Sequence, residues 1–331
     1  MGTEPFVGDR VVVRYRLGPG APEDWRPAPN PATTSGPSLS DVTGIVTDGG
    51  TPELIRLDRD GTVVEIPRPA ITSVRVLSRR TVRNSDIRAV EYAAAHAWPG
   101  TESGWIAGWL VRAGGGYTRR ANCAVPVDIG ARADGATLTA IADWYRARSL
   151  PPQLAWPDRL LPAAHLPGPL EQPVQVLTGR FEEITVVAGH ADVTLEPTIS
   201  DEWGDDWLGV RLAPESPADL PAAAAVIGSV RDGELRFAGV RDQGRLVAIG
   251  RGAVTPTPSG EPMLGVTALH TLPAHRGRGL AGQVLAALLG WGRERGADTV
   301  YLQVDAANRA PGAWYRRLGF GLHHEYGYVR L

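Results

Sequence analysis

The segment from Met263 to Gly296 constrains the fold of this 331-residue chain more than any other. It joins an apolar, strand-like run, MLGVTALHTLP, to a turn rich in Gly and Arg and then to LAGQVLAALLGWGRER. The last run places Leu280, Val284, Leu288 and Trp291 on one side at helical spacing. This order predicts a strand, a tight turn and an amphipathic helix, as in an α/β protein.

The turn before this helix has the chemistry of a phosphate site. The first amides of a helix have no intrahelical partner and carry partial positive charge, and glycines let an anion approach them. The turn therefore predicts a cradle for a pyrophosphate. It is neither a P-loop, because no Gly-Lys-[Ser/Thr] follows, nor a Rossmann turn, because G-x-G-x-x-G is absent.

Two spaced signatures then indicate a family. Arg276-x-x-Gly279-x-Ala281 resembles motif A of the GNAT N-acyltransferases. After one helix and one strand, Asn308 is followed seven residues later by Tyr315 and then by Gly319-Phe320, which resembles the second GNAT signature. Both occur in the family's order, so residues 190–331 are identified as a GNAT domain with a mixed sheet flanked by helices, an α/β (α+β) fold.

The resemblance implies direct transfer of an acetyl group from acetyl-CoA to an amine in a ternary complex, with no metal. Two strands would separate to admit the thioester. Its implied site residues are the backbone of Leu269, His270 and Thr271 for the pantetheine, the amides of Arg276, Gly277, Arg278, Gly279, Leu280 and Ala281 for the pyrophosphate, Asn308 for the cofactor, and Tyr315 as the general acid on the thiolate.

The general base is not evident from the sequence. Many GNAT proteins carry Glu or His on the strand before motif A, where this chain has Gly265 and Thr267. We predict Asp305 as the base, with His270 and Glu325 also near in sequence. A water chain, or an acceptor amine of low pKa, would serve as well.

The remaining sequence predicts two further domains. Residues 1–80 contain about five strand-like runs, a Pro-rich loop and an Asp60-Gly61 hairpin signal, and they resemble an SH3-like barrel. Residues 84–185 resemble a degenerate GNAT half without a cradle in its 126–135 loop, and 190–331 form the catalytic half. The layout is similar to a mycobacterial histone-acetyltransferase-like GNAT family.

Within 84–185, the sequence predicts a helix from residue 84, capped by Asn84 or Ser85. Two strands, in 105–114 and 117–127, would be joined by the glycines at 114–116, and a second helix fits 136–149.

Composition limits partners and location. With 34 basic and 36 acidic residues, net charge −2, a general polyanion-binding role is disfavoured, so we expect no nucleic-acid partner. No run approaches a membrane span, no signal peptide is visible, and Cys123 is the only cysteine. We therefore expect a cytoplasmic protein with Cys123 buried as a small hydrophobe.

Three functional hypotheses follow. In the first, the chain is an acetyltransferase whose acceptor is a small-molecule amine. In the second, the acceptor is a protein or peptide docked by the barrel. The third is a non-catalytic, acyl-CoA-binding regulatory protein that has lost its base.

Other polar and aromatic features have two interpretations each. His323 and His324 fit solvent or the rim of a cleft better than a metal site. Trp203 and Trp207 either line an acceptor pocket or pack on the sheet. The acidic residues near them either attract a cationic acceptor or favour the helix start. These acidic residues are Asp201, Glu202, Asp205 and Asp206.

Overall fold

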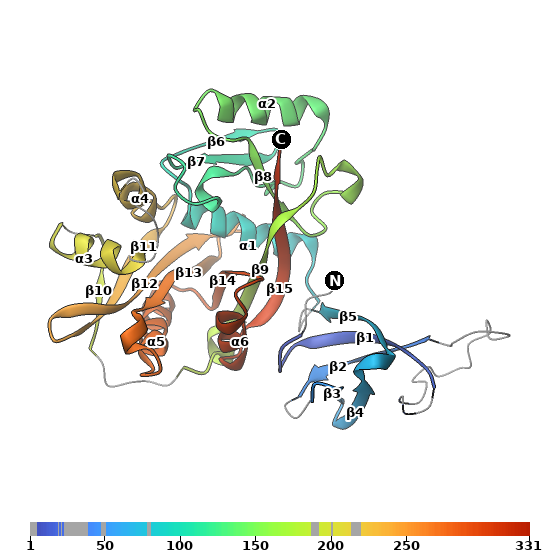
Figure 1. Cartoon of the computed structure of the whole chain (residues 1–331). Coiled ribbons are helices and arrows are strands. Elements are labelled where there is room, and N and C mark those ends of the chain that lie inside the picture. Colours follow the sequence, from blue (N-terminus) through green and yellow to red (C-terminus); the bar gives the residue numbers. More distant parts are fainter. Residues whose placement is uncertain are drawn as a thin grey trace. The chain divides into compact units, whose positions relative to one another are not determined.

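The chain forms two compact units in a computed structural model (Figure 1). The structure describes residues 5–18, 20, 22, 39–47, 51–77, 81–186, 192–199, 201–212 and 220–331. The first unit contains the described part of 1–81 together with 308–323. The second contains 82–307 and 324–331.

A five-stranded antiparallel sheet with its own core makes up most of the first unit. Its strands are β1 (Arg10–Arg16), β2 (Leu39–Val46), β3 (Leu54–Arg59), β4 (Thr62–Pro67) and β5 (Ile71–Leu77), in the order β4-β3-β2-β1-β5, with the 3₁₀ turn η1 (Arg68–Ala70) before β5. Alternate residues of β1, Val11, Val13 and Tyr15, point into the core.

The predicted hairpin at Asp60-Gly61 is confirmed. These two residues join β3 to β4 with φ of 52° and 85°, the left-handed pair that a tight hairpin requires. Closure of the sheet into an SH3-like barrel stays a prediction, and most of the Pro-rich loop lies outside the described residues.

The second unit is built on an eight-stranded mixed sheet flanked by helices, as the sequence predicts. Its order is β10-β11-β12-β13-β14-β9-β15-β8. The strands are β8 (Gln153–Pro157), β9 (Glu171–Arg180), β10 (Val193–Glu196), β11 (Glu234–Asp242), β12 (Arg245–Pro256), β13 (Pro262–Thr271), β14 (Thr299–Asp305) and β15 (Gly321–Arg330), whose residues from 324 onward belong to this unit.

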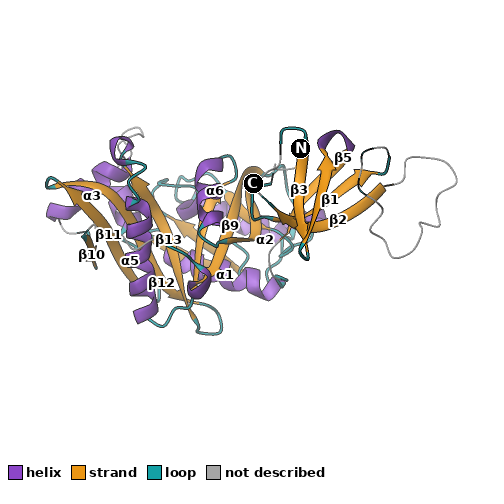
Figure 2. Ribbon diagram, turned by 90° about the horizontal axis from the view of Figure 1, so that it is seen from below, coloured by secondary structure: helices purple, strands orange, loops and turns teal. Residues whose placement is uncertain are grey.

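Among the described residues, five helices and a hairpin complete the second unit, and one further helix belongs to the first. Figure 2 shows helices lying against the strands of the large sheet. The helices are α1 (Asn84–Ala97), α2 (Gly135–Arg146), α3 (Asp201–Leu212), α4 (Leu220–Ile227), α5 (Leu280–Glu294) and α6 (Arg309–Arg317); the hairpin is β6 (Glu102–Ile106) with β7 (Trp109–Ala113), and the 3₁₀ turns are η2 (Arg120–Asn122), η3 (Ala163–His165), η4 (Phe181–Glu183) and η5 (Pro273–His275). Among the described residues, no helix has the length and apolar character needed to cross a membrane.

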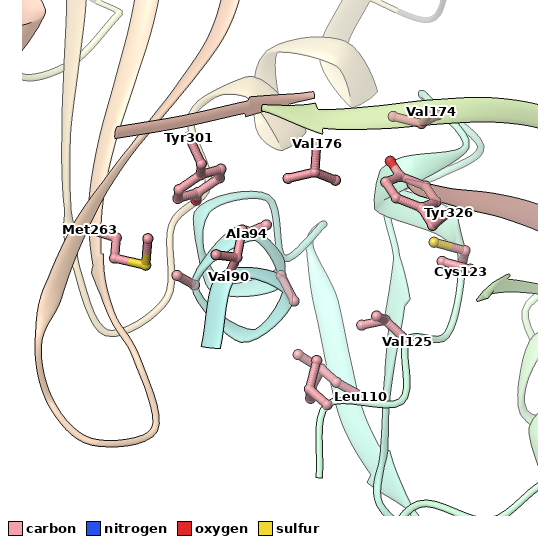
Figure 3. Close-up of a cluster of buried hydrophobic side chains, with 14 of the residues drawn as sticks. Val90, Ala94, Leu110, Cys123, Val125, Val174, Val176, Met263, Tyr301 and Tyr326 are labelled. Carbon is pink, nitrogen blue, oxygen red and sulfur yellow. The ribbon is translucent and has the colours of Figure 1, made fainter. Parts of the chain in front are cut away.

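Strand β9 ties the middle of the chain into the sheet that carries the GNAT signatures. It lies between β14 and β15 and pairs antiparallel with β14 from Val174 opposite Asp305 to Arg180 opposite Thr299. The core joins the same parts of the chain. Figure 3 shows Val90 of α1 and Val176 of β9 in one buried cluster with Tyr301 of β14. Strands from both sides of residue 187 thus share one sheet.

Three local predictions were wrong. The run WIAGWL turns at Ala107 and Gly108, with φ of 44° and 86°, and forms the β6–β7 hairpin instead of one strand. Residues 117–127 form η2 and isolated bridges. Helix α1 takes Arg83 as its N-cap, whose amide donates to Asp86 at 2.8 Å, while Asn84 is already helical.

Arg251 of β12 joins the sheet to two helices. Its side chain is fully buried, and its guanidinium donates to the final carbonyls of α1 and α4, Ala97 at 2.9 Å and Ile227 at 2.7 Å. It also donates to the Ser229 carbonyl at 2.6 Å. Helix C-termini carry partial negative charge, so these carbonyls stabilise a buried cation that forms no ion pair with a carboxylate of the described residues. Burial nevertheless lowers the pKa of Arg251 to about 9.

We predict that Arg251→Met lowers the free energy of unfolding by about 3 kcal/mol or more, because each buried carbonyl left without a donor costs about 1–3 kcal/mol. Urea unfolding of the two proteins measures the difference. Arg14→Met is the control, because it removes an exposed ion pair with Asp41, and solvent screens such pairs so that they contribute little to stability. Equal, small losses in both variants would contradict the anchoring role.

His96 of α1 predicts a pH dependence of stability. Its Nδ1 lies 2.8 Å from the Tyr92 carbonyl, and burial lowers the pKa of His96 below its ordinary value of 6.5. The unfolded chain therefore takes up a proton that the folded chain resists. Stability should fall as pH drops below that value, by up to about 1.4 kcal/mol per pH unit. His96→Gln should flatten this slope in urea titrations at pH 5 to 7; an unchanged slope would refute the assignment.

Candidate functional site

Strands β13 and β14 separate within the second unit. They run parallel but pair only at Leu264 with Val300 and at Gly265 with Tyr301. Beyond these pairs β13 continues to Thr271 and β14 to Asp305. The opening between strands that the GNAT resemblance implies is therefore present.

A bulge lies on β13 where it borders this opening. The register with β12 shifts between Ile249 and Arg251, and Ala268 has a φ of 53°. Backbone groups of successive residues alternate in direction along a strand. His270 pairs with Ile249, whereas the Thr271 carbonyl accepts from Arg276 Nε at 3.2 Å. Leu269 and Thr271 thus direct backbone groups away from β12.

The predicted pyrophosphate cradle is an open turn at the start of α5. Gly277 and Gly279 have φ of 76° and 77°, and no side chain caps the helix at Gly279. A Cβ placed on Gly277 would meet nothing within 4 Å, and one on Gly279 would meet only Gln283 Nε2 at 3.8 Å. Leu280 anchors the first turn in the core while 276–279 remain exposed. The geometry therefore fits an anionic group on the helix amides.

The β11–β12 turn brings a carboxylate to this cradle, which the sequence analysis missed. Asp242 accepts from Arg278 at 2.7 Å and lies 3.6 Å from His275 Nε2. The hydrogen bond from Arg278 holds the pKa of Asp242 below its ordinary value. Asp242 thereby orients Arg278 and offsets part of the positive charge at the turn.

Asn308 and Tyr315 lie with α6, in the first unit. Asn308 is the N-cap residue, and its carbonyl accepts from Gly312 at 3.4 Å. The Tyr315 ring is 8% exposed and packs edge-on against Phe320, with centroids 5.5 Å apart. Burial raises the pKa of Tyr315 well above 10, so its phenol stays protonated at neutral pH.

Neither Gly265 nor Thr267, the positions where many GNAT proteins carry a general base, has a side chain that can act as one. The phenol of Tyr301 fills the space where a side chain at Gly265 would lie, and the Thr267 hydroxyl accepts from Arg251 at 3.4 Å. Asp305 is exposed at the end of β14, and its Oδ1 accepts from the Ala307 amide at 2.8 Å. Glu325 accepts from Gln175 at 2.8 Å.

A buried polar cluster within the second unit was also missed. The interpretation of His324 as a solvent or rim residue is wrong: it is buried, with Nε2 2.9 Å from Glu91 Oε1. The sequence pattern that could have revealed this cluster is the alternation of His324, Tyr326 and Tyr328, which places them on one face of β15. The cluster surrounds a cavity lined by Glu91, Ala94, Ala95, Arg112, Arg120, Cys123, Ala155, Gln303, Tyr326 and Tyr328.

Two remaining predictions concern Cys123 and the tryptophans of α3. Cys123 is buried, as expected, and burial raises the pKa of its thiol. Trp207 is fully buried and packs edge-on against Phe237, so it belongs to the core and does not line a pocket. Asp206 pairs with Arg241 at 2.9 Å. The side chains of 201–205, including Trp203, lie outside the described part of the chain.

Comparison with known proteins agrees with this geometry. A family model described as "Probable histone acetyltransferase Rv0428c C-terminal" matches residues 84–329. A protein named "Probable histone acetyltransferase Rv0428c" from Mycobacterium tuberculosis (strain ATCC 25618 / H37Rv) is 40% identical over 330 residues, 98% of this chain and 95% of that protein.

A solved structure gives the fold. A GCN5-related N-acetyltransferase from Kribbella flavida has a TM-score of 0.51 and 18% identity, covering 76% of this chain and 96% of its own. The chain therefore has the GNAT fold, is an acyltransferase, and belongs to the Rv0428c family of probable histone acetyltransferases.

Proposed function

We propose that the protein transfers an acetyl group from acetyl-CoA directly to an amine nitrogen in a ternary complex. The observation that carries the proposal is the combination, in one compact unit, of separated parallel strands, a bulge beside the opening and an open cradle at Gly277–Gly279. A pantetheine chain can extend β13 through its free edge, as an added strand would. The amides of 276–281 would hold the pyrophosphate.

The chemistry follows from acyl transfer at a thioester. The amine nitrogen forms a bond to the acyl carbon, the C–S bond breaks, the amine loses a proton and the thiolate gains one. We propose the Tyr315 phenol as the donor of the second proton, because burial keeps it protonated at neutral pH. Asn308 would bind the cofactor chain. A strand-edge amide near Leu269 would stabilise the oxyanion.

The first proton needs an acceptor, and we retain Asp305 for this role. Its carboxylate is exposed beyond the last β13–β14 pair, and the Ala307 amide orients one of its oxygens. An alkylamine has a pKa of about 10, so it arrives protonated and a carboxylate removes the proton through a water relay. With Asp305→Asn, an unchanged pH–rate profile would remove Asp305 from the mechanism.

Two acceptor classes follow. The first is a small-molecule amine. The second, a lysine of a basic protein, is favoured by the printed name of the relative that is 40% identical over nearly the whole chain. This chain contains no lysine, so a protein-acetylation assay has no background from lysine autoacetylation. Thiol release over matched panels of amines and basic peptides distinguishes the two.

We predict that Gly279→Asp abolishes acetyl-CoA binding, because it adds a like charge to a phosphate site and a side chain at φ 77°. At about 100 times its dissociation constant, acetyl-CoA should stabilise the wild-type fold by about 2.7 kcal/mol. The matched control is Gly290→Asp, which adds the same carboxylate at an exposed position later in α5. Thermal shifts of equal size in both variants would contradict the cradle.

We predict that Tyr315→Phe lowers kcat by about 10²-fold or more, because a general acid contributes about 10²–10⁴-fold. Acetyl-CoA binding should persist. The control is Tyr145→Phe, which removes a buried hydroxyl bonded to the Arg112 backbone and so affects stability and not turnover. Binding of acetyl-CoA by the wild type, without turnover of any amine, would instead support the non-catalytic hypothesis.

A further inference from the structure

The N-terminal segment 6–9 is a turn fixed to the five-stranded sheet of the first unit. The Phe6 amide donates to Asp9 Oδ2 at 2.9 Å, and the Asp9 amide donates to the Phe6 carbonyl at 3.0 Å. Gly8 and Asp9 exchange backbone hydrogen bonds with Val46 of β2, at 2.8 and 2.9 Å. These hydrogen bonds therefore orient the Asp9 carboxylate independently of its contact with Arg316.

Helix α6 meets this turn through a buried ion pair. Asp9 accepts from Arg316, and the two side chains are 3% and 1% exposed. Arg316 also donates to the Gly312 carbonyl, one turn earlier in its own helix, at 3.2 Å. A charge buried to this extent is strongly destabilised without its partner, so the pair fixes Arg316 on this face of α6.

Phe6 adds an aromatic contact along the same face. Its ring lies between two guanidiniums of α6, 4.7 Å from Arg309 and 4.6 Å from Arg316. Gly312 also faces the ring, since a Cβ at that position would lie 3.8 Å from it, in van der Waals contact. Residues 309, 312 and 316 fall on one side of a helix, so both its rotation and its position along the axis are specified.

The helix needs such support. It has nine residues, includes Pro311 and Gly312, and is far shorter than a helix that is stable alone. Its orientation therefore depends on tertiary contacts, and the almost fully buried Asp9–Arg316 pair is one of them. Tyr315 precedes Arg316 directly, so any rotation of the helix moves the Tyr315 phenol.

We infer that Asp9 and Phe6 are positioning residues for helix α6, and that the five-stranded sheet is thereby an integral part of the acetyl-transfer machinery. This inference rests on the proposed role of Tyr315. It gives the N-terminal sheet a function within the reaction, where the sequence suggested a docking site for a protein or peptide acceptor. The cradle belongs to the second unit, whereas Asn308 is the N-cap residue of α6, so the inference predicts a large loss of turnover and a much smaller loss of acetyl-CoA affinity.

The test uses full-length Asp9→Asn, with Asp41→Asn as the matched control. Asp41 makes an ion pair with Arg14 on the same sheet, but both side chains are about half exposed. Asp9→Asn should lower kcat by about 10²-fold, the loss that a misplacement of about 1 Å produces, with acetyl-CoA affinity within about threefold of wild type. Asp41→Asn should match wild type in both.

Rescue and hydrogen exchange make the result decisive. In Arg316→Ala, added guanidinium should restore part of kcat by occupying the space beside Asp9. Peptides from 309–317 should exchange faster in Asp9→Asn than in Asp41→Asn, a readout that needs no turnover. If Asp9→Asn does not fold, Phe6→Leu replaces it and should show the same separation of kcat from affinity.

Two outcomes would overturn the inference: a folded Asp9→Asn or Phe6→Leu with wild-type kcat, or unchanged exchange in 309–317. Absence of wild-type turnover, with faster exchange in Asp9→Asn, would instead refute the proposed function and leave the positioning of α6 intact.

Discussion

A buried guanidinium that binds helix-end carbonyls organises the larger unit. Arg251 sits on β12 and bonds the last carbonyls of α1 and α4, so the ends of two helices converge on one strand. Its neighbours on either side, Gly250 and Gly252, face Val284 and Leu288 of α5. One strand thus fixes helices on both faces of the sheet, and it does so beside the bulge at Ala268 that borders the opening.

The opening itself depends on the pairing of a small and a large residue. Gly265 leaves room for Tyr301, and these two residues form the last pair before β13 and β14 separate. Beyond that point β14 pairs on its other edge with β9, a strand that precedes the GNAT signatures in the sequence. The middle of the chain therefore supports the strand that borders the site, which explains why one family model spans 84–329.

Local features were predictable from the sequence and distant pairings were not. The open turn before α5 and the turn at Asp60-Gly61 are each encoded by consecutive residues, because glycine and helix-start chemistry act locally. The turn at Ala107-Gly108 was missed because WIAGWL also fits a continuous apolar strand. Pairing of His324 with Glu91 and of Arg316 with Asp9 spans 233 and 307 residues, and no local pattern marks such partners.

We propose that the eight-stranded sheet, with strands from 153–180 and from 193–330, builds a single acyl-CoA site at the start of α5. Isothermal titration of the full-length protein with acetyl-CoA would count the sites. We expect one molecule bound per chain, because the 126–135 loop carries no cradle. Two sites per chain, or none, would contradict it.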